Sequence, residues 1–368
     1  MLTPDELRGA RQRAQLLSGE QPRDVIEAVA RLGAVQAQLG TAAQLALRAR
    51  TTATTATDVE RAREDRSLVC TWTLRGTLHL VAAADVRWMV DLLGPVNAAG
   101  GRRRRESLGL DPATCERGVE AITEVVRGSP PLPRAELIRR VAEHGVRVDP
   151  KTQAPAHLVG YAANAGAICR GPDLDGEATY VLLDEWVPHR GRLDGGRLDR
   201  DDALAELARR YLAAHAPAVV TDFAAWSGLP VADARRAFEL IGSELSTVET
   251  DAGPLLAPST STGAGTPPPP RLLGHFDPLL LGYRSKDLLL DPSRAKVIQA
   301  GGGFLRPAVL VDGRVAGTWR LDRSRKASTV LVEPFDRLSP DVADMLEAEA
   351  GDIARFLGAD VRLRIDHA

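Results

Sequence analysis

Two glutamines spaced two positions apart, Gln36 and Gln38, are the residues of this chain whose types and spacing point most directly to chemistry. In the run Val35-Gln36-Ala37-Gln38-Leu39, apolar and amide side chains alternate. Residues at i and i+2 do not share a face of a helix, but they share a face of an extended segment. An extended stretch would put both amides on one side, with Val35, Ala37 and Leu39 packed on the other. An amide carbonyl there can accept a hydrogen bond from water, and its dipole weakly stabilises a nearby cation. The alternative is two surface glutamines at a helix end.

The remaining chemistry-bearing residues form no familiar site. The three cysteines stand far apart without CxxC spacing, so a disulfide framework or thiolate metal site is not expected, and a reducing cytoplasm fits. The seven histidines are scattered and form no HExxH motif. Gly301-Gly302-Gly303 lacks a following Lys-Ser/Thr and predicts a turn rather than a phosphate loop. We therefore expect no metal and no cofactor.

No membrane attachment is expected. The sequence has no run of 18 apolar residues, and its acidic, helix-like start does not resemble a signal peptide. A cytoplasmic protein is the expectation.

The elements around the glutamines follow the order of a winged helix. Thr3-Pro4-Asp5-Glu6 combines an N-cap, a proline at N1 and acids in the first turn, which predicts a helix to about Leu17. A second helix is predicted from Pro22 and a third over residues 57–65. Two strands, at residues 69–73 and 77–81, then flank Arg75-Gly76.

This order recurs twice. Residues 133–144 and 156–167 predict helices, followed by strands around a wing-like turn at 171–176. In the third copy, Gly228-Leu229-Pro230 predicts the turn of a helix-turn-helix over residues 227–241. Three weak copies in tandem are more specific than any one of them. The third copy has predicted helices at 201–215, from 221, and at 231–241, and predicted strands at 246–250 and 255–257.

A Ser-, Thr-, Gly- and Pro-rich stretch, residues 258–270, separates these repeats from a β-rich end. There Asp312-Gly313 predicts a hairpin turn, and residues 339–357 predict an acidic helix. We therefore predict an α+β chain of three tandem winged helices and a small β-rich domain. The predicted C-terminal strands are 288–290, 309–311, 315–321, 329–332 and 361–365. The predicted domains are residues 1–105, which carry Gln-x-Gln, 106–198, 199–265 and 271–368.

Charge is nearly balanced overall but segregated along the chain. The net charge of −2 excludes a uniformly basic nucleic-acid-coating protein, but not a basic face balanced by acid elsewhere. Residues 187–200 have a net charge of +2, residues 320–326 one of +3, and residues 333–352 one of −6. Each basic run could be a solvated loop. However, residues 322–328 join two predicted strands, and such a basic hairpin tip can track phosphates or enter a groove. The DNA-binding candidates are Arg102, Arg103, Arg104, Arg190, Arg192, Arg323, Arg325 and Lys326.

Three motifs together resemble one family. They are Leu32–Gln38, Thr71–Leu80, and Phe276–Tyr283 together with Val311–Trp319. In combination they are similar to the tandem winged-helix DNA glycosylases of the AlkZ/YcaQ type, over nearly the whole chain. The resemblance implies three winged helices and a β-barrel-like domain that form a C-shaped, DNA-binding concavity. It also implies excision of N7-alkylated purines and unhooking of interstrand crosslinks in double-stranded DNA.

The same resemblance assigns catalysis to Gln36 and Gln38. Their Gln-x-Gln form resembles the azinomycin self-resistance branch, whereas a Gln-x-Asp form is more typical of broader crosslink repair. A purine alkylated at N7 is already cationic and leaves as a neutral base without a general acid. What remains is to hold a water and tolerate an oxocarbenium-like sugar. A neutral amide pair would thus restrict the enzyme to activated lesions. Arg75 and His79 are possible supporting residues, although a turn arginine and a strand histidine are more often structural.

The first lysine of the chain is Lys151, so no amine near Gln36 supplies a Schiff-base nucleophile. We expect a monofunctional, monomeric hydrolase that leaves an abasic site. Two rivals remain open at this stage. A winged-helix transcription regulator would bind one operator and release no base, because a fold does not fix function. A drug-sequestering protein would bind the free alkylator without acting on DNA.

Overall fold

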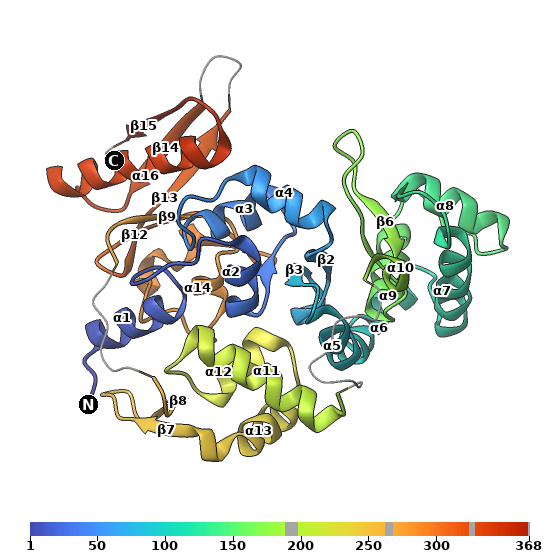
Figure 1. Ribbon diagram of the computed structural model, residues 1–368, viewed down its shortest axis with the longest axis horizontal. Coiled ribbons are helices and arrows are strands. Elements are labelled where there is room, and N and C mark those ends of the chain that lie inside the picture. Colours follow the sequence, from blue (N-terminus) through green and yellow to red (C-terminus); the bar gives the residue numbers. More distant parts are fainter. Residues whose placement is uncertain (188–197, 262–267, 324–327, 367–368) are drawn as a thin grey trace. The chain divides into compact units, whose positions relative to one another are not determined.

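The computed structural model describes residues 1–187, 198–261, 268–323 and 328–366. They group into two compact units, each with its own interior (Figure 1). Both contain helices and strands, which confirms the predicted α+β class. The division into four domains stays a prediction. Unit 1 comprises Met1–Glu60, Ala205–Trp226 and Val231–Ala368, and unit 2 comprises Arg61–Leu204 and Ser227–Pro230.

The first helix of the chain begins at the predicted cap Thr3, and the second begins three residues after the predicted start at Pro22. The Thr3 hydroxyl accepts from the Glu6 N–H and the Glu6 carboxylate accepts from the Thr3 N–H, a reciprocal capping box. Asp24 caps the second helix through the N–H of Ile26. One helix, α3, was not predicted, because Leu39 offers it no side-chain cap. The helices are α1 (Pro4–Ala14), α2 (Val25–Leu32), α3 (Gly40–Arg48) and α4 (Ala56–Glu64), and the strand β1 (Val35–Gln36) precedes α3.

The next part of unit 1 has an aromatic interior. The rings of Tyr211 and Phe223 lie 5.3 Å apart, and those of Phe223 and Phe238 5.5 Å apart. The predicted helices and strands of this region are all present, and the two strands pair antiparallel. The elements are α11 (Arg200–His215), α12 (Val220–Ser227), α13 (Val231–Leu240), η2 (Gly242–Glu244), β7 (Leu245–Val248) and β8 (Leu255–Pro258).

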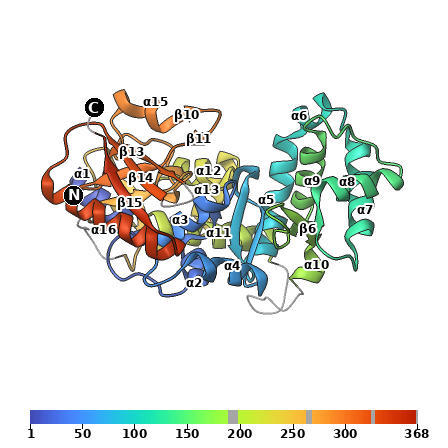
Figure 2. The same ribbon diagram turned by 90° about the horizontal axis from the view of Figure 1, so that it is seen from above.

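A curled half-barrel sheet lies near the C-terminus, with the order β15-β14-β13-β12-β9 (Figure 1). The acidic helix α16 covers one face, where Leu346 and Ile353 pack on Trp319 and Val330 (Figure 2). Ser339 caps this helix, as expected. The sheet elements are β9 (Arg271–Leu273), β12 (Ala308–Val311), β13 (Arg314–Asp322), β14 (Ser328–Pro334), α16 (Pro340–Leu357) and β15 (Val361–Ile365).

The strand predicted at residues 288–290 is wrong. These residues form a turn in which Leu289 and Leu290 are buried, so the apolar run reflects burial and not pairing. The elements between β9 and β12 are α14 (Pro278–Leu281), η3 (Pro292–Arg294), α15 (Ala295–Ile298), β10 (Gln299–Gly301) and β11 (Phe304–Leu305).

Unit 2 contains both of the other predicted hairpins. Its strands follow the order β3-β2-β5-β6-β4, and the Cys70↔Arg170 pair of β2 and β5 joins the two hairpins, a pairing the sequence did not indicate. Ile122, Leu137 and Leu158 form part of the core. The elements are β2 (Leu68–Trp72), η1 (Leu74–Gly76), β3 (Leu78–Ala82), α5 (Val86–Gly100), α6 (Arg102–Ser107), α7 (Pro112–Val126), β4 (Leu132–Pro133), α8 (Arg134–Glu143), α9 (Ala154–Asn164), β5 (Ile168–Arg170), β6 (Thr179–Leu182) and α10 (Leu183–Trp186).

Within the described parts of the chain, no helix combines the length and apolar character needed to cross a membrane.

Candidate active site

The two glutamines lie in an extended link between helices α2 and α3. Helix α2 ends at Gly33, whose φ of +78° turns the chain out of the helix. A Cβ on Gly33 would lie in ordinary van der Waals contact with the Trp226 ring, at 3.6 Å, so the positive φ is what favours glycine here. Strand β1 follows, and the backbone remains extended at Leu39 (φ −115°, ψ 121°) before α3 starts at Gly40.

The side chains of Gln36 and Gln38 contact each other directly. Gln36 is 6% exposed, and its Nε2 donates to Oε1 of the exposed Gln38 at 2.7 Å. An amide oxygen has two lone pairs, so Gln38 Oε1 keeps the capacity for one more donor such as water. The buried glutamine therefore orients the exposed one.

The predicted packing of the opposite face is only partly correct. Val35 is buried, but Ala37 is half-buried and Leu39 is 39% exposed. The expectation that Leu39 packs inside is wrong, because the chain turns into α3 at this residue and Leu39 stands at the helix N-cap.

Helix α3 is anchored by two arginines near its C-terminal end. The buried Arg48 donates through Nη2 to Glu349 Oε2 at 2.9 Å and through Nη1 to Asp352 Oδ2 at 3.0 Å. Burial disfavours its charge, but the two carboxylates outweigh this and raise the pKa of Arg48. Glu349 in turn accepts from Arg271 and from the Leu272 N–H.

The second anchor is a fully buried ion pair. Both side chains of Arg50 and Asp277 are 0% exposed, and their bidentate hydrogen bonds measure 2.9 and 2.6 Å. Asp277 also accepts from the Leu279 N–H and so caps α14. Asp277 belongs to one of the motifs that carry the family resemblance, whereas no local signal marks Arg48 or Arg50 as its partners.

The predicted supporting residues Arg75 and His79 both lie in unit 2. His79 is 1% exposed, and its Nδ1–H donates to the Thr77 carbonyl at 2.9 Å. Burial, followed by the charge of Arg75, lowers the pKa of His79 to about 3, so its ring is neutral at neutral pH and supplies no proton there. Burial also lowers the pKa of Arg75 to about 10, which leaves the guanidinium charged.

The arginine run at Arg102 forms helix α6 of unit 2. Arg102 pairs with Glu106 at 2.7 Å, and Arg104 donates to Gln153 at 2.8 Å. Arg105 lies over the Tyr161 ring. Arg103 is exposed. Local partners thus occupy most of this run.

The predicted basic hairpin is formed by β13 and β14, whose last pair is Asp322↔Thr329. Arg323 is exposed beside it. The other four DNA-binding candidates, Arg190, Arg192, Arg325 and Lys326, lie outside the described residues.

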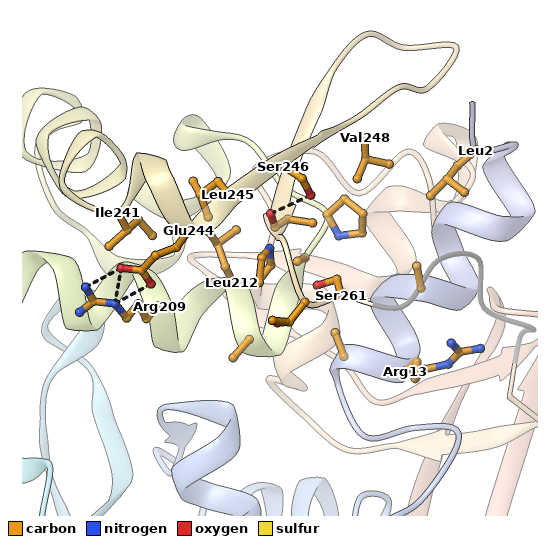
Figure 3. A pocket seen from close by; sticks show the side chains of 18 of the residues that line it. Leu2, Arg13, Arg209, Leu212, Ile241, Glu244, Leu245, Ser246, Val248 and Ser261 are labelled. Atoms are coloured by element: carbon orange, nitrogen blue, oxygen red, sulfur yellow. Dashed lines mark hydrogen bonds and ion pairs between the residues drawn. The ribbon is translucent and has the colours of Figure 1, made fainter.

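A separate hollow of about 620 Å³ in unit 1 is lined by α1, α11, β7 and β8 (Figure 3). Neither Gln36 nor Gln38 lines it. Its Arg209 forms a pair with Glu244 at 2.8 Å, and apolar side chains such as Leu212 and Ile241 make up much of the wall. Among the described residues there is no cluster of three or more histidines, cysteines or carboxylates suited to hold a metal ion.

Comparison with known proteins supplies the family. The sequence matches the family described as "DNA glycosylase AlkZ-like" over residues 29–356, a span that includes the glutamine pair, Arg75 and Asp277. The chain belongs to the AlkZ-like DNA glycosylase family. This result confirms the resemblance drawn from the three motifs.

A curated sequence and a solved structure that resemble this chain both come from Streptomyces sahachiroi. The chain is 28% identical over 369 aligned residues to an "Interstrand DNA cross-link repair glycosylase", covering 95% of each chain. The solved structure of the DNA glycosylase AlkZ superposes with a TM-score of 0.83 at 24% identity, covering 99% of this chain and 100% of that one. The second likeness shows that the AlkZ fold extends over essentially the whole chain.

Other motif residues of this AlkZ-like chain have clear structural roles. Trp319 donates from Nε1 to the Leu273 carbonyl at 2.8 Å, and Asn97 donates to the Thr73 carbonyl at 2.6 Å. Arg75 has a positive φ of 54° within η1. The Trp319 and Asn97 contacts hold backbone segments of the motifs in place.

Proposed function

We propose that this chain is a monofunctional DNA glycosylase that hydrolyses the N-glycosidic bond of N7-alkylated purines and unhooks interstrand crosslinks. The observation that carries the proposal is the hydrogen-bonded pair Gln36–Gln38 in a chain of the AlkZ-like family. The crosslink-repair name of the Streptomyces relative supports the crosslink as substrate.

The proposed reaction requires few catalytic groups from the protein. Alkylation at N7 makes the purine a cation that departs as a neutral base, so no general acid is required. Gln38 Oε1 accepts from the attacking water while Gln36 holds that amide in orientation. The carbonyl dipole also favours the oxocarbenium-like sugar. The product is a free base and an abasic site.

The surrounding chain is proposed to supply DNA binding. We assign this role to three tandem winged helices and a β-barrel-like domain that form a C-shaped concavity, with Arg102, Arg103, Arg104, Arg190, Arg192, Arg323, Arg325 and Lys326 as phosphate contacts. The Gln-x-Gln form favours a narrow range of azinomycin-type lesions and a role in antibiotic self-resistance. We further propose a cytoplasmic monomer that needs no cofactor.

Excision from defined DNA tests this function. Purified protein is expected to convert 7-methylguanine DNA to alkali-labile abasic sites and to release one strand of an N7-crosslinked duplex. Gln36→Ala and Gln38→Ala should each slow excision by about 100-fold or more, because one preorganised hydrogen-bonding group in a site contributes on the order of 10²–10³. DNA affinity should change little.

Three outcomes would contradict the proposal. Binding to one operator without base release would favour a transcription regulator, and binding of free alkylator alone would favour sequestration. Borohydride trapping of the protein on DNA would show a covalent lyase instead of a hydrolase. As a matched control, Gln44→Ala removes an amide of α3 that donates to Glu60 at 2.9 Å and should leave excision nearly unchanged.

A further inference from the structure

A short hairpin of unit 1, formed by β10 and β11, ends in a bare glycine tip. Gly301, Gly302 and Gly303 have φ angles of +93°, +59° and +79°. A Cβ placed on any of them would meet no atom within 4 Å, so the tip faces open space. Backbone without side chains can approach another molecule closely and offer its N–H groups to anions.

The residue after this tip, Phe304, presents an aromatic ring on a firm base. Phe304 is 38% exposed, yet its ring packs edge-on against Phe276 at 5.2 Å and an interplanar angle of 81°. The His275 ring lies 5.0 Å from it on the same base. Phe276 is buried and holds a φ of +54°, a strained value for a bulky residue. The hairpin therefore holds one face of a flat apolar ring at the surface.

The segment that contains the hairpin carries basic residues and no acidic ones. Residues 292–307 contain three bases, Arg294, Lys296 and Arg306, and no acid. All three are exposed, and Arg294 reaches to 4.0 Å from Asp336. A flat apolar ring among cations and bare amides complements a ligand with stacked flat rings and regularly spaced phosphates. Duplex DNA has that chemistry.

Two close contacts link the hairpin to helix α3, which follows Gln36 and Gln38 in the chain. Gly274 packs so closely on α3 that a Cβ there would lie 3.1 Å from Leu45 Cβ and 3.4 Å from the Ala42 carbonyl. The next residue, His275, donates from Nδ1–H to the Leu305 carbonyl at 3.0 Å. One short segment thus touches the first turns of α3 on one side and the hairpin on the other.

We propose that the β10–β11 hairpin is a DNA wedge in which Phe304 inserts at a base step beside the lesion. Gly301–303, Lys296 and Arg306 lie along the adjacent phosphates. The proposal rests on the glycosylase function, and it addresses a difficulty of that function. A crosslinked base cannot rotate freely out of the helix, but an apolar wedge can unstack and kink the duplex around it.

Fluorescence of 2-aminopurine placed next to the lesion tests the wedge. Wild-type protein should raise the fluorescence of the duplex, and Phe304→Tyr should preserve the rise because it keeps the ring. Phe304→Ala should abolish the rise and slow excision from duplex by about tenfold, in line with the loss of one base–aromatic stack. For Phe304→Ala, excision from single-stranded alkylated DNA should fall less than about twofold, because single-stranded DNA has no stacked duplex base step that must be opened. Phe304→Gln, which keeps much of the side-chain volume but is not an apolar wedge, replaces the alanine variant if that variant does not fold.

The matched control is Met345→Ala, because Met345 is 40% exposed but lies on the acidic helix α16. Met345→Ala should alter neither the fluorescence rise nor the rate of excision. Equal losses on duplex and single strand, or an unchanged fluorescence rise in Phe304→Ala, would overturn the wedge. If wild-type protein releases no base, the glycosylase proposal fails, but the fluorescence on undamaged duplex still decides whether Phe304 unstacks DNA.

Discussion

At the residue scale, the candidate site is built from neutral groups. Gln36 and Gln38 carry no charge, and the supporting candidates from the sequence, Arg75 and His79, do not change charge near neutral pH. The alternation of Val35-Gln36-Ala37-Gln38-Leu39 was enough to predict an extended segment with both amides together. It was not enough to predict that one glutamine is buried and donates to the other, because burial depends on residues distant in the sequence.

His79 gives a prediction on pH. Its folded pKa of about 3 lies below the ordinary value of 6.5, so only the unfolded chain binds the proton between those limits. This contribution to stability is complete above pH 6.5 and is lost as pH falls toward 3. Comparing pH 7 with pH 5, the unfolding free energy of wild type relative to His79→Asn should fall by about 2 kcal/mol.

Urea denaturation of both proteins at the two pH values measures this difference. The asparagine side chain in His79→Asn retains a donor for the Thr77 carbonyl, so the hydrogen bond is matched. A difference that does not change with pH would show that His79 titrates in the folded protein as it does in the unfolded chain.

At the element scale, the local signals of the sequence predicted some elements and missed others. The helices capped by Thr3, Asp24 and Ser339 were predicted, and so was the hairpin turn at Asp312-Gly313. Helix α7 was missed although Asp111 caps it and a proline stands at its start. Helices α3 and α5 were also missed; both lack a side-chain cap, and α5 contains Pro95.

The Arg50–Asp277 pair gives a prediction about how α3 is held. Arg50→Met leaves a buried carboxylate without a counter-charge and should destabilise the protein by about 3–5 kcal/mol. In the double variant Arg50→Met/Asp277→Asn that charge is gone, while the introduced asparagine can still cap α14. The double variant should therefore be more stable than Arg50→Met alone.

Chemical denaturation of the two variants and wild type provides the measurement. Glu239→Gln, an acidic residue on the exposed side of α13, is a suitable control for charge change and should alter stability by less than about 0.5 kcal/mol. A double variant that is less stable than the single one would mean that Asp277 stabilises the fold mainly in another way.

At the scale of the whole molecule, a balanced total charge hides local imbalance. The acidic helix α16 and the acid-free segment 292–307 both belong to unit 1, and the arginine helix α6 belongs to unit 2. The sequence showed these runs, but it did not show which arginines already have partners. Arg102 is paired with Glu106, while Arg103 is exposed.

The salt dependence of DNA binding tests whether Arg103 contacts a phosphate. If Arg103 contacts a phosphate, Arg103→Ala should weaken binding to any duplex and reduce the slope of log affinity against log salt by about 1. Arg139→Ala is the matched control, because Glu136 and Glu143 already hold that side chain. Fluorescence anisotropy over a salt series measures both, and equal slopes for the two variants would remove Arg103 from the DNA-binding set.

The anchoring of α3 also depends on residues that are made late in the synthesis of the chain. Arg48 finds Glu349 and Asp352 about 300 residues later in the chain, and Arg50 finds Asp277 about 230 residues later. At roughly 5–20 residues per second, the ribosome needs on the order of 15–60 s to make the last of these partners. Helix α3, which follows the glutamines, can therefore gain its full set of ion pairs only after α16 has been synthesised.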